Sequence, residues 1–452
     1  MRKRTLLGIG LLTLLGALVA CRQETPSPAS PEVVLRLVDP YGNPGLGWVA
    51  YQVGDGPWRT LLPQSPGEYR FSLPEGETRY GVAAACPHIG PIAPAWSPTR
   101  FFVFQLTAGD TLAPVIPCGN GTGVEFGALK LTVDASAVGA NKVVALSRST
   151  GSEAASGREF DVAAPVGERR FVVLAYDGDR EPEKLRGVRI FSARVPGSLR
   201  LTLGPEDAVN LGTGHRAGRV EAFTVPAGYD PSYGVGYYGS RGPVMASPPD
   251  FPIGLNALGT GAFHAGPYAL VNGGEAGESY VFQVWGSKPD FSRRVGTIAF
   301  RPPATEVFRP GPLPDPWPDA YAVAPSRRPR FALDRDDGPA GYRILLLSGS
   351  GNIPTQALEV YLSRAWLEGR NTYLTPDLSG AEGFAGSRPE SGERVLWEVD
   401  AVYTDVPLGR WLESPDWLVW VVPIFAMPAG TQPVLGGADW RVSAARGRFA
   451  AP

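Results

Sequence analysis

Short segments in which apolar and polar residues alternate run along almost the whole chain. The segments span five to nine residues and are rich in Val, Phe, Tyr and Trp, and glycine, proline and aspartate fill the intervals between them. Every second side chain of a β-strand faces the same side, so this pattern predicts strands and leaves little room for helices. The 57 glycines and 46 prolines among 452 residues predict many tight turns. The predicted fold class is all-β.

One dipeptide marks the start of four strong strand segments. Gly-Glu precedes an alternating apolar run each time, and successive copies lie 91, 110 and 115 residues apart. These intervals match the length of single β-sandwich domains. The four copies are Gly76-Glu77, Gly167-Glu168, Gly277-Glu278 and Gly392-Glu393. The repeat predicts four sandwiches in tandem.

The phase of the apolar residues divides the four copies into two pairs. In the first two copies the apolar residues fall at even steps after the glycine, and in the last two they fall at odd steps. An offset of one residue turns side chains to the opposite face of a strand, so we infer two kinds of sandwich. In the last copy Glu398 and Asp400 occupy the phase opposite to the apolar residues, which predicts that both face solvent.

Two segments of the first sandwich carry a family resemblance. The strand and turn of residues 33–44, with Asp39 before a glycine and a proline, and the later run Gly67-Glu-Tyr-Arg-Phe-Ser-Leu-Pro74 resemble transthyretin-like or carboxypeptidase-regulatory-like domains. The runs at residues 277–284 and 392–401 resemble the late strand of fibronectin type III domains, with Val395 in place of that family's tyrosine. These resemblances imply tandem immunoglobulin-like β-sandwiches.

The repeat and the proline-rich stretches set the expected domain boundaries. We expect the segment at 303–329, which contains eight prolines, to be an exposed spacer open to proteases. The expected parts are a signal peptide (1–20), a tether (21–32), four sandwiches (33–118, 124–204, 216–302 and 330–450) and the proline-rich linker (303–329).

The first 21 residues have the parts of a secretory signal. Three basic residues precede a short apolar run, and small residues stand before Cys21. This arrangement resembles the lipobox of bacterial lipoproteins. The resemblance implies cleavage before Cys21 and lipidation of that cysteine, so the membrane becomes a partner through the lipid anchor. Arg22 follows the cysteine, which favours the outer membrane or cell surface over the inner membrane.

Charge and cysteine content limit the remaining functions. The net charge of −2 falls to −5 once the three N-terminal basic residues are removed, which offers no basis for nucleic-acid binding. Beyond Cys21 only Cys86 and Cys118 remain, and two cysteines in an exported chain most simply form a disulfide. A redox or metal pair that involves His88 is the alternative.

No catalytic or metal-binding motif stands out in the sequence. The three histidines, His88, His215 and His264, fall in different predicted domains, so we expect no metal, no cofactor and no enzyme activity. The acidic run at 334–338 ends in Gly-Pro, which indicates a turn rather than a calcium loop.

Aromatic residues are the remaining candidates for ligand contact. They are either exposed contacts for a protein or a sugar, or parts of the cores. The candidates are Tyr233, Tyr237, Tyr238, Trp366 and Trp411. We expect a binding, adhesion or structural module of the envelope, with a protein or glycan partner. The alternatives are an envelope hydrolase that acts on glycans through an unrecognised pair of carboxylates, or an accessory subunit of an envelope complex.

Overall fold

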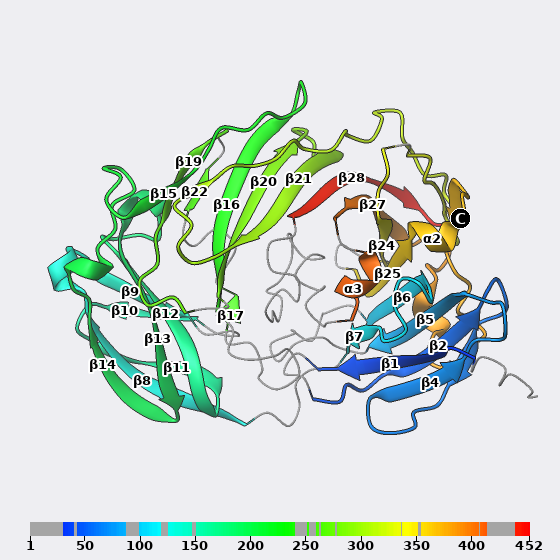
Figure 1. The fold of residues 1–452 in the computed structure, drawn as a ribbon, viewed down its shortest axis with the longest axis horizontal. Coiled ribbons are helices and arrows are strands. Elements are labelled where there is room, and N and C mark those ends of the chain that lie inside the picture. Colours follow the sequence, from blue (N-terminus) through cyan, green and yellow to red (C-terminus); the bar gives the residue numbers. More distant parts are fainter. Residues whose placement is uncertain are drawn as a thin grey trace, which may run out of the picture.

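The computed structural model shows an all-β chain and confirms the predicted fold class (Figure 1). The predicted signal peptide and Cys21 lie outside the described residues. Those residues are 30–39, 43–86, 99–118, 125–146, 151–239, 251–252, 259–261, 264–275, 278–335, 337–350, 354–405, 407–413 and 439–452.

Helices are few and short in these ranges. Two are α-helices of one turn, α2 (Arg364–Leu367) and α3 (Leu408–Trp411). Four are single 3-10 turns, at Ser136–Val138, Pro182–Lys184, Pro205–Asp207 and Ala385–Ser387. Among the residues described, no helix has both the length and the apolar character needed to cross a membrane.

The first sandwich packs a three-stranded sheet against four strands of a larger sheet. The smaller sheet has the order β4 (Glu68–Ser72), β1 (Glu32–Val38), β7 (Val115–Pro117). The four strands opposite it are β3 (Arg59–Leu61), β2 (Trp48–Val53), β5 (Arg79–Cys86) and β6 (Thr99–Thr107). Alternate residues of both layers fill the core between them, including Leu35, Phe71, Tyr80 and Phe104.

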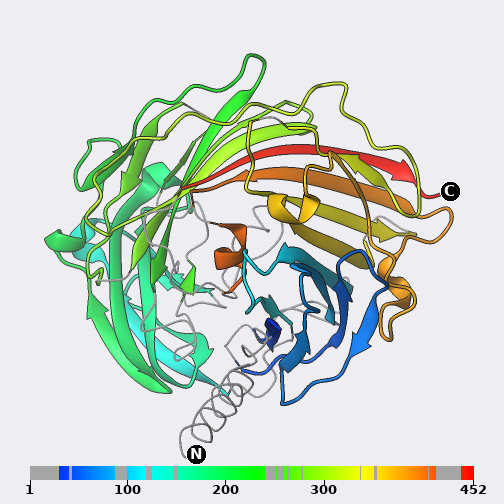
Figure 2. The ribbon, with the colours of Figure 1, turned by 45° about the vertical axis from the view of Figure 1, so that its right-hand side comes forward.

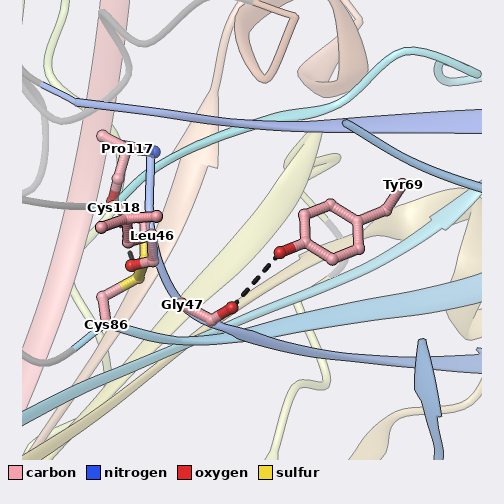
Figure 3. Close-up of a disulfide and its surroundings, with 6 residues drawn as sticks. All are labelled: Leu46, Gly47, Tyr69, Cys86, Pro117 and Cys118. Carbon is pink, nitrogen blue, oxygen red and sulfur yellow. Dashed lines mark hydrogen bonds between the residues drawn. A yellow bond between two sulfur atoms is a disulfide. The ribbon is translucent and has the colours of Figure 1, made fainter. Parts of the chain in front are cut away.

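A disulfide joins the two layers of this sandwich, as predicted. Cys86 ends β5 and Cys118 follows β7, and their Cα atoms lie 5.2 Å apart (Figure 3). Gly47 runs beside the bridge, where an added Cβ would come within 2.6 Å of the Cys118 Sγ. Tyr69 donates a hydrogen bond to the Gly47 carbonyl at 3.3 Å. A glycine at this position therefore allows the chain to pass close to the disulfide.

The second sandwich has two sheets of its own. One has the order β10 (Gly151–Ala155), β9 (Lys142–Leu146), β12 (Gly167–Tyr176), β13 (Leu185–Val195). The other has the order β11 (Glu159–Pro165), β8 (Phe126–Asp134), β14 (Gly197–Thr202). Their shared core contains Leu131, Val162, Phe171 and Phe191.

The third sandwich packs against the second. Its small sheet has the order β19 (Gly266–Ala269), β15 (Ala217–Val220), β22 (Val307–Phe308). Its other strands are β17 (Phe251–Pro252), β16 (Asp230–Gly239), β18 (Gly259–Gly261), β20 (Ser279–Ser287) and β21 (Arg293–Arg301). One apolar core combines Val172 and Ile190 of the second sandwich with Tyr237, Tyr280 and Phe282 of the third, so these two units share their interior.

The last sandwich completes the chain. Its main strands are β24 (Gly341–Gly349), β25 (Gln356–Ser363), β27 (Arg394–Tyr403) and β28 (Asp439–Ala450). They are covered on one face by the pair β23 (Arg330–Ala332) and β26 (Thr372–Leu374), together with α2.

Strands of the first, third and last sandwiches join into one sheet of 13 strands. β21 pairs antiparallel with β28, and β25 pairs in parallel with β6. Figures 1 and 2 show the result as a curved band of strands that runs from β16 through β28 and β25 to β2. The prediction of four separate sandwiches in tandem is wrong in this respect, because edge strands of the third and first sandwiches find hydrogen-bond partners in the last one.

The proline-rich segment at 303–329 is bound to the surface of two sandwiches. Trp317 is buried and donates from Nε1 to the Ser443 carbonyl of β28 at 2.8 Å. The guanidinium of Arg293 donates to the carbonyls of Pro318, Asp319 and Tyr321 at 2.8 to 3.1 Å. These contacts hold the segment against the two sandwiches, so the expectation of a free spacer is wrong. Its cleavage by proteases stays a prediction.

Candidate functional site

A groove with a volume of about 660 Å³ lies where the first sandwich meets the last. Its walls come from the β2–β3 turn, from β6, from α2 with the residues after it, and from the segments beside β23 and β26. The polar, charged and aromatic residues that line the groove include Gln52, Asp55, Trp58, Gln105, Arg328, Arg330, Trp366, Arg370, Tyr373 and Asp377.

The parallel pairing of β6 with β25 brings the two walls together. Without it, residues near position 55 and residues near position 370 would belong to separate units. Side chains also cross the boundary: Arg370 Nη1 lies 3.2 Å from Asp55 Oδ1, and Arg79 Nη1 lies 3.3 Å from Glu368 Oε2. The groove is therefore a product of the joined sheet.

An aromatic ring forms part of the first wall. Trp58, which is half-buried, lies over β5 at Gly81, where an added Cβ would come within 2.7 Å of the indole. Any larger residue at position 81 would displace the ring. The glycine at this position of β5 thus leaves room for Trp58 in the groove.

Three polar side chains that line the groove keep an atom without a hydrogen-bond partner. The atoms are Gln105 Oε1, Trp366 Nε1 and Tyr373 Oη, and all three are buried. Gln105, Trp366 and Tyr373 are 3, 5 and 4% exposed. A buried polar atom without a partner costs roughly 1–3 kcal/mol, so each of these three atoms would gain from a ligand that supplies one.

The charges in the groove are mostly paired. The hydrogen bonds and charges of Arg370 and Arg79 outweigh the effect of burial and hold the pKa of Asp55 below its usual value. Asp377 pairs with Arg388 and accepts a hydrogen bond from the Ser379 hydroxyl at 2.7 Å. Arg328 donates to the Thr375 carbonyl at 2.8 Å. Arg330 is exposed, and its guanidinium meets no acceptor among the described residues.

The structure places the five aromatic candidates in different surroundings. Trp366 lines the groove, although Arg370 covers its ring at 4.5 Å. Tyr233 and Tyr237 are buried in the core shared by the second and third sandwiches, and Trp411 is buried beside Trp440. Tyr238 lies in β16, with its side chain outside the described residues. For the other four residues the prediction of exposed contacts is wrong, because the neighbouring sheets cover Tyr233, Tyr237 and Trp411, and Arg370 and the core of the last sandwich cover Trp366.

A second feature is a buried charge cluster on the other face of the large sheet. Arg343 Nε donates to Glu359 at 2.6 Å, and Arg343 Nη1 donates to Glu398 and Asp400 at 2.7 Å each. Arg446 pairs with Glu398. The prediction that Glu398 and Asp400 face solvent is wrong: they are 7 and 6% exposed, because the first sandwich and α3 cover this face of β27.

The charge cluster borders an enclosed cavity of about 30 Å³, which has room for about two water molecules. Arg294, Trp285 and Trp440 line it together with Asp400, whose Oδ1 has no hydrogen-bond partner. Burial and the charge of Glu398 raise the pKa of Asp400 to about 6. Burial opposes the charged form of Glu398 as well, but Arg343 and Arg446 outweigh it and lower that pKa to about 2. The cavity is too small for a ligand, so the larger groove is the better candidate binding site of the two.

Replacing Asp400 by Asn should remove a pH dependence of stability. Because the folded chain binds the Asp400 proton more tightly than the unfolded chain, wild-type stability should rise as the pH falls from 7 toward 4, by up to about 3 kcal/mol from this group. Glu398 acts in the opposite direction, and its contribution is lost below about pH 4. Urea midpoints across pH 4–7 measure the difference between wild type and Asp400→Asn.

The exposed Asp405 supplies a matched control for this experiment. Asp405→Asn should keep the wild-type dependence of the urea midpoint on pH. Asp400→Asn should flatten this dependence between pH 4 and 6. The same dependence of the urea midpoint on pH in wild type and in Asp400→Asn would show that Asp400 is ionised throughout this range.

The histidines and the acidic run at 334–338 form no metal site in the part of the chain that the structure describes. No group of three or more His, Cys, Asp or Glu side chains is arranged to hold a metal ion there. His264 Nδ1 is hydrogen-bonded to the Phe223 carbonyl, His215 lies in a turn, and His88 is outside the described residues. In the acidic run, Asp337 pairs with Arg335 and accepts a hydrogen bond from Tyr403.

Comparisons with known proteins place the chain in no family. No protein-family model and no curated protein matches it. Among solved structures, it is similar to the Bacillus anthracis TIE protein at 9% sequence identity and a TM-score of 0.14. The matched region covers 63% of this chain and about half, 51%, of that chain. A TM-score this low does not establish a shared fold.

Proposed function

We propose that the protein is a lipid-anchored binding protein of the bacterial cell envelope, and that the groove between its first and last sandwiches holds the ligand. The observation that supports this proposal most directly is the set of three polar atoms without hydrogen-bond partners beneath the groove, which belong to Gln105, Trp366 and Tyr373. They comprise one acceptor and two donors, so a polyhydroxylated ligand such as a glycan chain would complement them.

The envelope location is supported by the N-terminal sequence and by the disulfide. Disulfides persist in oxidising compartments outside the cytoplasm, and Cys86 and Cys118 are bonded. A lipobox-like segment ending at Cys21 offers the anchor. Two or three acyl chains on one cysteine would hold the protein stably at a membrane.

The state of the acids in the groove favours binding over hydrolysis. Glycan hydrolysis needs a carboxylic acid that can donate a proton near neutral pH. Asp55 is paired with two arginines that lower its pKa, and Asp377 is paired with Arg388. The lowered pKa of Asp55 keeps this carboxylate ionised, which suits electrostatic organisation of a binding surface better than proton donation.

One observation favours the accessory-subunit alternative. Leu46, Trp48 and Leu62 are exposed near the start of β2 and the end of β3, with exposed fractions of 71, 48 and 74%. Such side chains suit a protein contact.

The anchor is tested by Cys21→Ser in the full chain expressed in a bacterial host. We expect wild type to require detergent for extraction and the variant to appear in the soluble extracytoplasmic fraction, because the variant lacks the acyl chains. Extraction of both proteins only with detergent would contradict lipidation at Cys21.

The groove is tested by Tyr373→Phe on an array of neutral and acidic oligosaccharides, with the full chain in detergent. The Tyr373 hydroxyl is buried and has no partner in the protein, so its loss should raise the stability of the free protein, by up to about 1–3 kcal/mol, and weaken glycan binding by about 3- to 10-fold. Tyr342→Phe is the matched control, since the Tyr342 hydroxyl donates to the Leu333 carbonyl at 2.8 Å. That variant should lose stability and keep its affinity. Absence of binding to every glycan by wild type would contradict the proposed function.

A further inference from the structure

We infer that the ligand of the groove is an acidic saccharide, in which sugar rings carry carboxylate groups. This inference rests on the proposed function and names the chemical class of the ligand. It comes from the arrangement of one aromatic ring, one set of unpaired polar atoms and one unpaired arginine in the same groove.

The aromatic ring and the unpaired atoms suit a sugar. A sugar ring has an apolar face of C–H groups and hydroxyl groups around its edge. Trp58 offers a rigid flat surface for such a face, held in place by Gly81. Gln105 can accept a hydrogen bond from a hydroxyl, and Trp366 and Tyr373 can donate one. Hydroxyl groups act as donors and acceptors, so one ligand type can meet both needs.

The balance of charges in the groove indicates that the ligand also carries an acidic group. Arginines outnumber acids in the groove by three to two, and both acids are already neutralised: Asp55 by Arg370 and Arg79, Asp377 by Arg388. An anion that enters therefore meets little repulsion. The exposed guanidinium of Arg330 meets no acceptor among the described residues, and its planar fork matches a carboxylate.

Arg330 is held at a fixed place on the rim. It begins β23, and its backbone is in register with Leu374 of β26, next to Tyr373. Because successive side chains of a strand face opposite sides, the side chain of Arg330 lies on the side of Leu374, and both residues line the groove that Tyr373 also lines. A carboxylate bound by Arg330 would place the attached sugar ring over the groove.

The test compares acidic oligosaccharides with their carboxyl-reduced, neutral counterparts. Oligogalacturonates of three to six rings are the probe, with the full chain in detergent and affinities from calorimetry. We expect wild type to bind the acidic form at least tenfold more tightly, because a charge-assisted hydrogen bond is stronger than a neutral one. Arg330→Gln should remove this preference and keep binding to the neutral form. Arg394→Gln, an exposed arginine outside the groove, should behave as wild type.

The outcomes separate this inference from the proposed function. Equal binding of acidic and neutral forms, still weakened by Tyr373→Phe, would overturn the acidic ligand and leave the groove as a glycan site. A preference that survives Arg330→Gln would overturn the assignment to Arg330. Binding of neither form would overturn the inference, and the oligosaccharide array then decides whether the proposed function falls with it. Thermal unfolding of each variant checks that it is folded.

Discussion

Replacing Arg343 by Met should destabilise the protein by about 3–5 kcal/mol at pH 7. Arg343 is 5% exposed and is hydrogen-bonded to three buried carboxylates, those of Glu359, Glu398 and Asp400. Methionine fills similar space without charge, so the variant leaves these carboxylates buried with only Arg446 and Arg294 nearby. Urea denaturation of the full chain gives the difference in unfolding free energy.

The pH dependence of this loss distinguishes charge from packing. Without Arg343 the folded state should hold protons on its buried carboxylates more tightly than the unfolded state does, so the destabilisation should shrink between pH 7 and pH 5. Arg394→Met, at an exposed position of β27, is the control and should change stability by less than about 0.5 kcal/mol. A loss of the same size at both pH values would show that Arg343 acts through packing alone.

Removing the disulfide should cost about 3–4 kcal/mol in the chain-entropy account, because the bridge closes a loop with a sequence separation of 32. Both cysteines are fully buried, so the double variant Cys86→Ala, Cys118→Ala keeps the core apolar. The bridge joins the two layers of the first sandwich, which also forms one wall of the groove.

The consequence of that loss should extend beyond the first sandwich. β6 is hydrogen-bonded to β25 through seven register positions, so loosening the first sandwich should expose the edge of the last one. Differential scanning calorimetry of the full chain, with and without reductant, measures the effect. A double variant with the wild-type transition would show that the core holds the layers together without the bridge.

The strand pattern of the sequence was sufficient to predict much of the fold. Each Gly-Glu copy stands at the head of a strand, at Glu77 before β5, Glu168 in β12, Glu278 before β20 and Glu393 before β27. The pairing of Cys86 with Cys118 follows from the cysteine count and from the expectation of an exported chain. These features are local or depend on composition, so the sequence carries them directly.

The joined sheet and the groove depend on contacts between distant parts of the chain. The pairing of β6 with β25 joins residues about 250 positions apart, and nothing in either strand specifies its partner. Glu398 and Asp400 alternate with apolar residues as a solvent-facing pair would, and only the covering of that face reveals a buried cluster. Trp366 was recognised as a candidate, but Trp58, Gln105 and Arg330 become significant only once the two sandwiches meet.

The most direct test of the binding site is hydrogen–deuterium exchange of the full chain, with and without the oligosaccharide that it binds most tightly on the array. We predict slower exchange of backbone amides in residues 52–58 and 372–380, the two walls of the groove, and unchanged exchange in residues 233–237, which lie in a different core. Bound oligosaccharide with no protection of either wall, or with protection confined to another part of the molecule, would contradict the account.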